Sequence, residues 1–359
     1  MAKGEQIVRM KLVPLAIAIA IATPASAQYQ MQVYGLWHCY SDACSWASVP
    51  NMTTFDADNH WIIDRSMDNT YHPSVNVVVL SFVNPVKLMN LTNDAGDVNG
   101  IPIGMTTSVV NYFQSRGIRV MFSIGGASYT KDWEKALSTN PIQLGTNAAN
   151  AARQFNVGIE IDYEKSSKPN LTGLQAFVTA YRAAIPYDAT GANYPARLTI
   201  DLGDGDTYLT AIADYATTHW LGTANPVLDY ANAMVASQST TVSTLEGGWQ
   251  QHVQGDSAVP PLAPAKLAGS LWAVGNNPIP NCIGPFSTSD QETAYNLVST
   301  IPPSGEGTSS GMLGYMFWGG GCQGNGTVCT YPPDSCQLGV GDGATTFNIP
   351  TGTFALRQQ

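Results

Sequence analysis

Three carboxylic acids occupy every second position of the apolar run VGIEIDYE, which covers residues 157–164. Side chains of a β-strand alternate between two faces, so Glu160, Asp162 and Glu164 would share one face of this strand. Neighbours on such a face lie roughly 6–7 Å apart, where two like charges repel by about 2 kcal/mol at an effective dielectric near 20. We therefore expect the row of acids to keep at least one proton at neutral pH.

A carboxylic acid that stays protonated near neutral pH can act as a general acid, and cleavage of a glycosidic bond requires one. Two structural interpretations compete with this one, a solvated strand edge and a network of ion pairs. Partners for such a network are scarce, because no basic residue lies within the run and only Lys165 and Lys168 follow it closely. The sequence therefore favours chemistry as the reason for the three acids.

The elements around this run predict a closed barrel. Eight short, apolar and β-branched runs alternate with stretches of helical periodicity, such as 174–185 and 208–220, the second of which Asp206 and Thr207 would cap. This alternation predicts an α/β fold, a (β/α)8 TIM barrel. A doubly wound open sheet is the rival, but no GxGxxG follows the first strand. The predicted strands cover residues 31–37, 75–83, 118–124, 157–163, 197–202, 228–235, 267–273 and 312–318.

A barrel would turn the acids toward its interior. Ile159, Ile161 and Tyr163 form the other face of the run and suit contact with the surrounding helices, which leaves the acids inside. Glu164 would then lie at the C-terminal end of its strand, on the face where barrel enzymes place their chemistry.

Residues 1–27 have the features of a secretory signal peptide. Basic residues precede an apolar run of about 11 residues, too short to cross a bilayer, and Ala25, Ser26 and Ala27 form a small-residue cleavage site. We therefore expect a secreted, extracellular protein. We also expect a monomer. Residues 1–27 carry three of the 16 basic and one of the 26 acidic residues, which leaves 13 and 25, a formal net charge of −12. This charge disfavours nucleic acid and anionic membranes as partners.

Six cysteines in an exported chain predict disulfide bonds. A zinc site is the competing interpretation, but the spacings contain no CxxC pair. We expect Cys39 to pair with Cys44, whereas three connectivities stay open for Cys282, Cys322, Cys329 and Cys336.

The acid row also resembles a known signature. VGIEIDYE is similar to the fourth-strand pattern DGxDxDxE of family 18 glycoside hydrolases, the chitinases, in which the final Glu is the catalytic acid. Upstream of it, SIGG at 123–126 resembles the SxGG of the third strand in that family. The runs YGLW at 34–37, SFV at 81–83 and GYMFW at 314–318 resemble the first, second and eighth strands, so the similarity spans most of the chain.

The resemblance implies substrate-assisted, retaining hydrolysis without a metal or an organic cofactor. Glu164 would be the catalytic acid and base, Asp162 would orient the N-acetyl group of the substrate, and Glu160 would share the proton of the row. Trp318 would form the hydrophobic floor under the sugar that is cleaved. The other substrate-binding residues that we predict are Tyr34, Phe82, Ser123, Gly125, Asn232 and Met234.

The chain departs from the family pattern at four positions. Val157 and Glu160 stand at the first two Asp positions of the signature, and Ala236 and Ser237 stand where the sixth strand carries a Tyr-Asp pair that contacts the acetamido group. Functions of different classes therefore stay open. One is a secreted chitinase acting on chitin or chitooligosaccharides, or a relative that cuts the same sugar linkage in N-glycans. The other is a lectin or inhibitor on the same barrel that has lost turnover.

Only 39 residues separate Trp272 from Met312, too few for the additional α+β domain of many relatives. We therefore expect an open groove and cleavage within the sugar chain. Residues 28–336 would form a single barrel domain, and residues 337–359 a C-terminal tail. Four tryptophans near predicted strand ends are candidate sugar platforms, namely Trp37, Trp46, Trp133 and Trp272.

Overall fold

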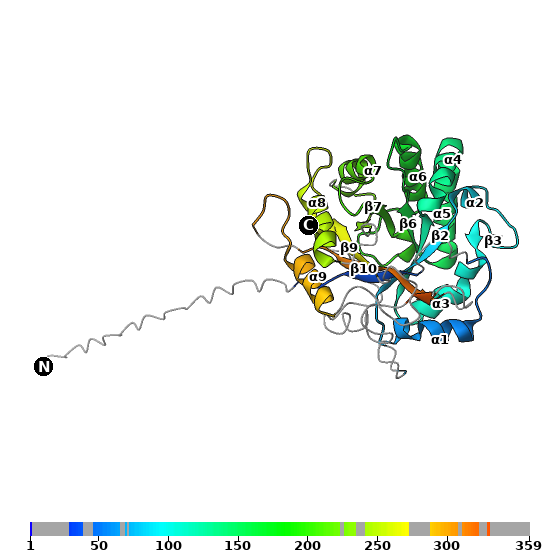
Figure 1. The fold of residues 1–359 in the computed structure, drawn as a ribbon, viewed down its shortest axis with the longest axis horizontal. Helices are drawn as coiled ribbons and strands as arrows, with labels where there is room; N and C mark the ends of the chain where they lie inside the picture. The colour runs from blue at the N-terminus through cyan, green and yellow to red at the C-terminus, as the bar shows by residue number, and fades with distance from the viewer. Residues whose placement is uncertain are drawn as a thin grey trace.

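The structure, a computed structural model, describes residues 1, 29–38, 46–64, 69, 72–222, 226–234, 241–272, 288–307, 311–322 and 329–330. Eight parallel strands form a closed barrel, because the first strand pairs with the last. Their order is β1-β2-β5-β6-β7-β8-β9-β10, which follows the sequence around the barrel (Figure 1). This closure confirms the predicted (β/α)8 fold and excludes the open sheet.

The barrel strands overlap all eight predicted runs. They are β1 (Val33–His38), β2 (Val77–Val83), β5 (Arg119–Gly125), β6 (Gly158–Asp162), β7 (Leu198–Leu202), β8 (Ala231–Ala233), β9 (Leu267–Trp272) and β10 (Gly314–Cys322). Two short strands, β3 (Asp97–Val98) and β4 (Ile101–Pro102), form a separate antiparallel hairpin. A further strand, β11 (Cys329–Thr330), pairs antiparallel with the end of β10.

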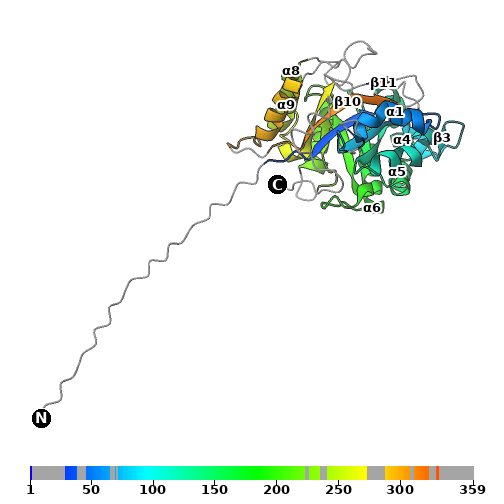
Figure 2. The same ribbon diagram turned by 90° about the horizontal axis from the view of Figure 1, so that it is seen from below.

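Helices surround the barrel, with α8 and α9 on one side and α1, α4 and α5 on the other (Figure 2). In chain order they are α1 (Met52–Ile63), α2 (Pro85–Met89), α3 (Thr107–Gln114), α4 (Thr130–Thr139), α5 (Pro141–Phe155), α6 (Leu171–Ala184), α7 (Thr210–Ala216), α8 (Val242–Gln254) and α9 (Thr288–Thr300). A π-helical turn continues α7 over Thr217–Leu221. Short 3-10 turns cover Ile103–Met105, Ala127–Tyr129, Tyr194–Ala196 and Pro264–Lys266.

Two apolar clusters hold the fold together. The large outer cluster lies between the strands and the helices, and it includes Ile159, Ile161 and Tyr163 of the acid-bearing run. The small inner cluster fills part of the barrel interior and consists of Val33, Trp37, Val77, Val79, Met121, Tyr230, Ala268, Leu313 and Met316, with Trp318 packed against it. The alternation of β6 therefore directs its apolar side chains to the helices, as the sequence predicts, and its acids to the interior.

The predicted cap of the 208–220 helix is wrong. Helix α7 begins at Thr210, and its N-cap position is Leu209, which has a left-handed backbone conformation (φ 56°) and makes no side-chain capping bond. The Asp206 carboxylate instead lies 2.9 Å from a ring nitrogen of His252 on α8. The other named helix, predicted over 174–185, forms as α6 and begins three residues earlier.

Several sequence predictions fall outside the described residues. These are the signal peptide, the Cys39–Cys44 disulfide, the state of Cys282 and Cys336, and the C-terminal tail. The backbone register of β10 and β11 places Cys322 opposite Cys329, and the disulfide pattern stays a prediction. Within the described part of the chain, no helix has the length and apolar character needed to span a membrane.

Candidate active site

The acid row enters the barrel from β6. Glu160 is completely buried, Asp162 is 2 % exposed, and Glu164 follows two residues after the strand and is half-buried. Because β6 is parallel to its neighbours, Glu164 lies at the carboxyl-end mouth of the barrel, as predicted. The three acids thus run from the interior toward solvent.

Glu160 is held by neutral donors. The Trp37 indole N–H donates to Oε1 at 2.8 Å, and the Asn232 side-chain amide donates to Oε2 at 2.8 Å. Burial raises the pKa of Glu160, while these two donors, Ser123 and Asp201 partly offset that rise. Within the described ranges, these neutral donors and not an ion-pair network hold Glu160.

A fourth acid, which the sequence analysis missed, completes the interior cluster. Asp201 on β7 is 2 % exposed, and burial raises its pKa well above the ordinary value, as do the negative charges of Glu160 and Asp162. Asp201 therefore keeps a proton more readily than an ordinary aspartate. The run Leu198–Leu202 (LTIDL) carries the same alternation as VGIEIDYE, so the signal for an inward acid was present in the sequence.

Gly125 allows β5 to approach the end of β6. A Cβ at Gly125 would lie 1.8 Å from the Asp162 carbonyl oxygen, and the residue has a positive φ of 125°. The same carbonyl accepts hydrogen bonds from the Trp133 indole at 2.9 Å and from the Gly126 amide at 3.0 Å. Gly125 is buried and permits this close strand packing, and its assignment as a substrate contact stays a prediction.

Two more predicted substrate contacts lie beneath the mouth. Ser123 is fully buried and faces Glu160 in the register between β5 and β6. Asn232 is 1 % exposed, and its amide is engaged with Glu160. In this arrangement both side chains support the carboxylate cluster from inside the barrel, and their assignment as substrate contacts stays a prediction.

The aromatic residues divide between the two faces of the strands. Trp318 is half-buried, and its ring centroid lies 5.7 Å from that of Trp37 and 6.0 Å from that of Phe82. Trp37, Trp318 and Phe82 thus form an aromatic cluster on the inner side of the barrel. Tyr34 is completely buried and packs on Tyr315 in the outer cluster. Residues 34 and 37 of one strand face opposite ways, so Tyr34 packs toward the helices, and its assignment as a substrate contact stays a prediction.

The remaining predicted site residues have different outcomes. Met234 directly follows β8, is half-buried and packs against the outer cluster. Of the candidate platforms, Trp46 donates to the Ser81 carbonyl and Trp133 packs in the helix layer, so both are core residues. The Trp272 side chain and the departure at residues 236 and 237 lie outside what the structure describes.

Tyr208 is a second residue that the sequence analysis did not assign to the site. It lies on the segment between β7 and α7, and its hydroxyl donates to Glu164 Oε2 at 3.3 Å. Partial burial raises the pKa of Tyr208 to about 12, together with the negative charges of Glu164 and Asp162. The Thr130 hydroxyl donates to the backbone carbonyl of Glu164 at 3.2 Å. Nothing in the local sequence of Tyr208 indicates this contact, since it depends on the path of a loop.

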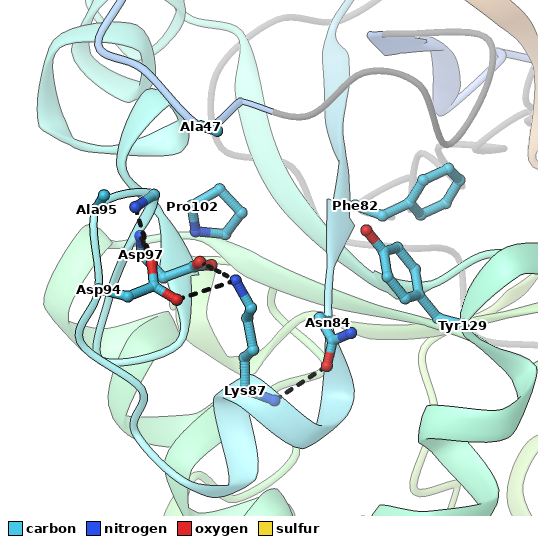
Figure 3. Close-up of a pocket in the computed structure, with 10 residues that line it drawn as sticks. Ala47, Phe82, Asn84, Lys87, Asp94, Ala95, Asp97, Pro102 and Tyr129 are labelled. Atoms are coloured by element: carbon cyan, nitrogen blue, oxygen red, sulfur yellow. Dashed lines mark hydrogen bonds and ion pairs between the residues drawn. The ribbon is translucent and has the colours of Figure 1, made fainter.

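A cavity of about 540 Å³ lies beside the mouth (Figure 3). Lys87 Nζ contacts Asp94 at 3.2 Å and Asp97 at 2.5 Å on its hairpin side, while Phe82 and Tyr129 face each other on its barrel side. Phe82 belongs to both the cavity and the aromatic cluster, so the two are contiguous. The lining residues are Ala47, Phe82, Asn84, Lys87, Asp94, Ala95, Gly96, Asp97, Pro102 and Tyr129.

Metal chemistry has no candidate ligand set in the described ranges, where no group of three or more His, Cys, Asp or Glu side chains could hold an ion. The described site offers carboxylic acids, the phenol of Tyr208 and an aromatic surface. Such a set can donate and accept protons and can bind the apolar face of a sugar ring.

No protein-family model matches the chain, and no curated protein matches it in sequence. Solved structures do match. A chitinase from Rhizomucor miehei superposes with a TM-score of 0.50 at 13 % identity, over 88 % of this chain and 100 % of that one. A GH18 chitinase from Pseudoalteromonas aurantia gives a TM-score of 0.49 at 14 % identity, over 88 % and 98 %. The match to the Rhizomucor miehei structure shows that the chain shares its barrel fold with a solved chitinase.

Proposed function

We propose that this chain is a secreted chitinase that hydrolyses β-1,4-linked N-acetylglucosamine chains with retention of configuration. The observation that carries the proposal is the arrangement around β6. Asp162 is buried inside the barrel, and Glu164 stands two residues later at the carboxyl-end mouth. The rings of Trp37, Phe82 and Trp318 pack on one another in the same barrel and offer an apolar surface for a sugar ring.

In the proposed reaction, Glu164 protonates the glycosidic oxygen while the carbonyl oxygen of the substrate's N-acetyl group attacks the anomeric carbon. The bond to the leaving sugar breaks, and a cyclic oxazolinium ion forms. Asp162 accepts a hydrogen bond from the acetamido N–H and stabilises the positive charge of this ion. Glu164, now a carboxylate, removes a proton from the incoming water, which opens the ring and restores the acid.

The interior acids support this scheme by their ionisation. Burial raises the pKa of Asp201 well above its ordinary value, and the charges of Glu160 and Asp162 raise it further, so Asp201 holds a proton more readily than an ordinary aspartate. A proton held on Asp201 lets Asp162 carry the negative charge that the acetamido N–H requires. Trp37 and Asn232 keep Glu160 in place beneath Asp162.

The cavity beside Phe82 would bind sugar units that lie beyond the cleaved bond. Phe82 and Tyr129 offer aromatic surface, and Asn84 and Asp94 offer polar atoms for sugar hydroxyls. A cavity that continues from the mouth along the surface favours binding of an internal stretch of the polymer. We therefore propose endo-type cleavage and chitooligosaccharides as ligands.

A lectin or inhibitor is the second candidate, and Ala236 and Ser237 favour it because they replace the Tyr-Asp pair expected on the sixth strand. A third is an endo-β-N-acetylglucosaminidase that acts on N-glycans. Retention of both Asp162 and Glu164 favours hydrolysis over binding alone.

Release of a fluorophore from chitobiose and chitotriose glycosides tests the proposal. We expect release by the wild type and a loss of at least about 10²-fold for Glu164→Gln, which keeps the shape of the side chain but cannot donate an acid proton. Glu292→Gln, on the exposed face of α9, is the matched control and should retain full activity. Oligosaccharide binding without release by the wild type would favour the lectin.

A further inference from the structure

The loop between β7 and α7 brings Tyr208 to Glu164. This loop comprises residues 203–209, and the Tyr208 hydroxyl is the donor that reaches Glu164 Oε2 at 3.3 Å. Tyr208 itself is 38 % exposed, so the contact is made at the open end of the barrel. A long side chain at an exposed position keeps one orientation only if its backbone is fixed.

His252 fixes the start of this loop from the neighbouring helix α8. Its Nε2 lies 2.7 Å from the Gly203 carbonyl oxygen, and its Nδ1 lies 2.9 Å from Asp206 Oδ1. His252 and Asp206 are 1 % and 2 % exposed at their side chains, so water does not compete with these contacts. The contact with Gly203 is a hydrogen bond to a backbone carbonyl, and the contact with Asp206 is a close approach of a ring nitrogen to a carboxylate.

Close packing against α8 fixes the loop further. A Cβ at Gly205 would lie 2.2 Å from Gln251 Oε1, and a Cβ at Gly248 would lie 1.9 Å from the Asp204 carbonyl oxygen. The Asp206 amide also donates to Gln251 Oε1 at 3.3 Å. The loop therefore lies directly on the helix, with two glycines at the contact.

The end of the loop is fixed as well. The Thr210 hydroxyl donates to the Asp206 carbonyl at 2.6 Å, and Leu209 is buried at 1 % exposure. Tyr208 thus stands between two anchored points, the His252 clamp on one side and the buried Leu209 on the other. Its hydroxyl has a defined place relative to Glu164.

We propose that Tyr208 is a positioning residue for Glu164 and that the clamp of His252 on Gly203 and Asp206 holds it there. The inference rests on the proposed function, in which Glu164 gives up and regains a proton. Through its hydrogen bond to Oε2, Tyr208 fixes the orientation of the Glu164 carboxyl group. The same donor stabilises the carboxylate that remains after proton transfer.

The groups that face Glu164 act in different directions. Tyr208 donates to its carboxylate, whereas the negative charge of Asp162 disfavours ionisation, and Lys165 is the next residue along the chain. The phenol keeps its own proton over the working range of pH, because the pKa of Tyr208 is raised to about 12. Removal of the phenol alone should therefore make Glu164 harder to ionise.

The first test compares Tyr208→Phe with Tyr215→Phe. Tyr215 lies on α7, and its hydroxyl donates to Gln175 at 3.2 Å, so the control loses an equivalent bond away from the mouth. For Tyr208→Phe we expect kcat to fall about 3- to 10-fold, KM to stay within about twofold, and the alkaline limb of the pH–rate profile to move up by about 0.5–1 pH unit. A change in KM alone would mean a substrate contact and would overturn the positioning role, as would a profile equal to that of Tyr215→Phe.

A second measurement does not depend on turnover. The ¹³C carboxyl signal of Glu164, assigned by its loss in Glu164→Gln, is titrated by NMR in the wild type, Tyr208→Phe and Tyr215→Phe. We expect an upward shift of the midpoint in Tyr208→Phe alone. If the wild type releases no sugar but the Glu164 midpoint still rises in Tyr208→Phe, the proposed function is contradicted and the contact is supported. If the wild type is active but the midpoint is unchanged in Tyr208→Phe, the function is supported and the positioning role is overturned.

The clamp is tested by His252→Gln, which should move the Glu164 midpoint in the same direction as Tyr208→Phe, because the loop loses an anchor. If this variant does not fold, Asp206→Asn retains the size of the side chain and weakens the same clamp. If the folded variant has the same Glu164 midpoint as the wild type, His252 and Asp206 do not hold Tyr208 in place.

Discussion

The Trp37 indole N–H donates to Glu160 Oε1 at 2.8 Å, which joins β1 to β6 through the interior of the barrel. Both side chains are buried, so this bond is made where water cannot replace it. Hydrogen bonds to a buried carboxylate matter most when the carboxylate is charged. The contact therefore couples the stability of the barrel to the ionisation of Glu160.

Trp37→Phe should destabilise the protein by an amount that grows with pH. Loss of the donor leaves a buried carboxylate undersatisfied at a cost of about 1–3 kcal/mol, and the pKa of Glu160 rises further. A folded-state pKa above the unfolded value means that stability is full at low pH and is lost as the pH rises. Urea unfolding between pH 4 and 8 measures the effect.

Trp46→Phe is the control for this substitution. Trp46 is also buried, but its indole donates to the uncharged Ser81 carbonyl at 2.8 Å. At low pH, Trp46→Phe should lower the free energy of unfolding by about as much as Trp37→Phe does. This loss should not change with pH. Equal pH dependence in the two variants would contradict the role assigned to Glu160.

Asp201→Asn should stabilise the protein at neutral pH. Burial raises the pKa of Asp201 well above its ordinary value, and Glu160 and Asp162 raise it further. Stability from this group is therefore full below the unfolded pKa, near 3.9, and is lost as the pH rises toward the folded pKa. An amide carries no such loss, so we expect a gain of at least about 1 kcal/mol at pH 7 that fades toward pH 4.

Asp188→Asn provides a control of opposite sign for the same unfolding experiments. Although burial acts to raise the pKa of Asp188, hydrogen bonds from Thr190 and Asn193 lower it below the ordinary value. Its contribution is present above the unfolded pKa and is lost as the pH falls. Asp188→Asn should therefore be less stable than the wild type near pH 7, and a stabilised Asp188→Asn would undermine the sign of the argument.

Periodicity predicts the parts of this fold that depend on neighbouring residues. The alternation of 157–164 correctly placed Glu160 and Asp162 inside a barrel, because apolar neighbours must meet the helices. The same rule applied to residues 34–37 would have turned Tyr34 away from Trp37, and applied to 198–202 would have placed Asp201 inside. The sequence analysis did not draw these two conclusions, because it relied on motif resemblance where alternation was available.

Other parts of the site depend on contacts distant in sequence. Tyr208 meets Glu164 across 44 positions, and His252 meets Gly203 across 49. No local pattern encodes such contacts, since loop paths follow from the packing of whole helices. The cavity likewise depends on how the β3–β4 hairpin lies beside Phe82.

Gly125→Ala should prevent normal folding or cost more than about 3 kcal/mol. The added methyl group would meet the Asp162 carbonyl oxygen at 1.8 Å, and the positive φ of 125° disfavours any side chain. Yield of soluble protein and thermal unfolding report the effect. Gly247→Ala in α8 has nothing within 4 Å of the new Cβ and should be neutral or slightly stabilising. A stable Gly125→Ala protein would mean that β5 and β6 are farther apart than described.

Asp162→Asn should lower kcat by at least about 10²-fold and change KM little. The variant retains the size of the side chain, and its amide can still accept a hydrogen bond, but it carries no negative charge to stabilise the oxazolinium ion. Because that ion forms only along the reaction path, the loss should appear in kcat and not in ground-state binding. Asp214→Asn, on the exposed face of α7, is the matched control and should behave as the wild type. Steady-state release of fluorophore from a chitotriose glycoside separates kcat from KM. An Asp162→Asn protein with unchanged kcat would exclude charge stabilisation by this residue, even if Glu164→Gln were inactive.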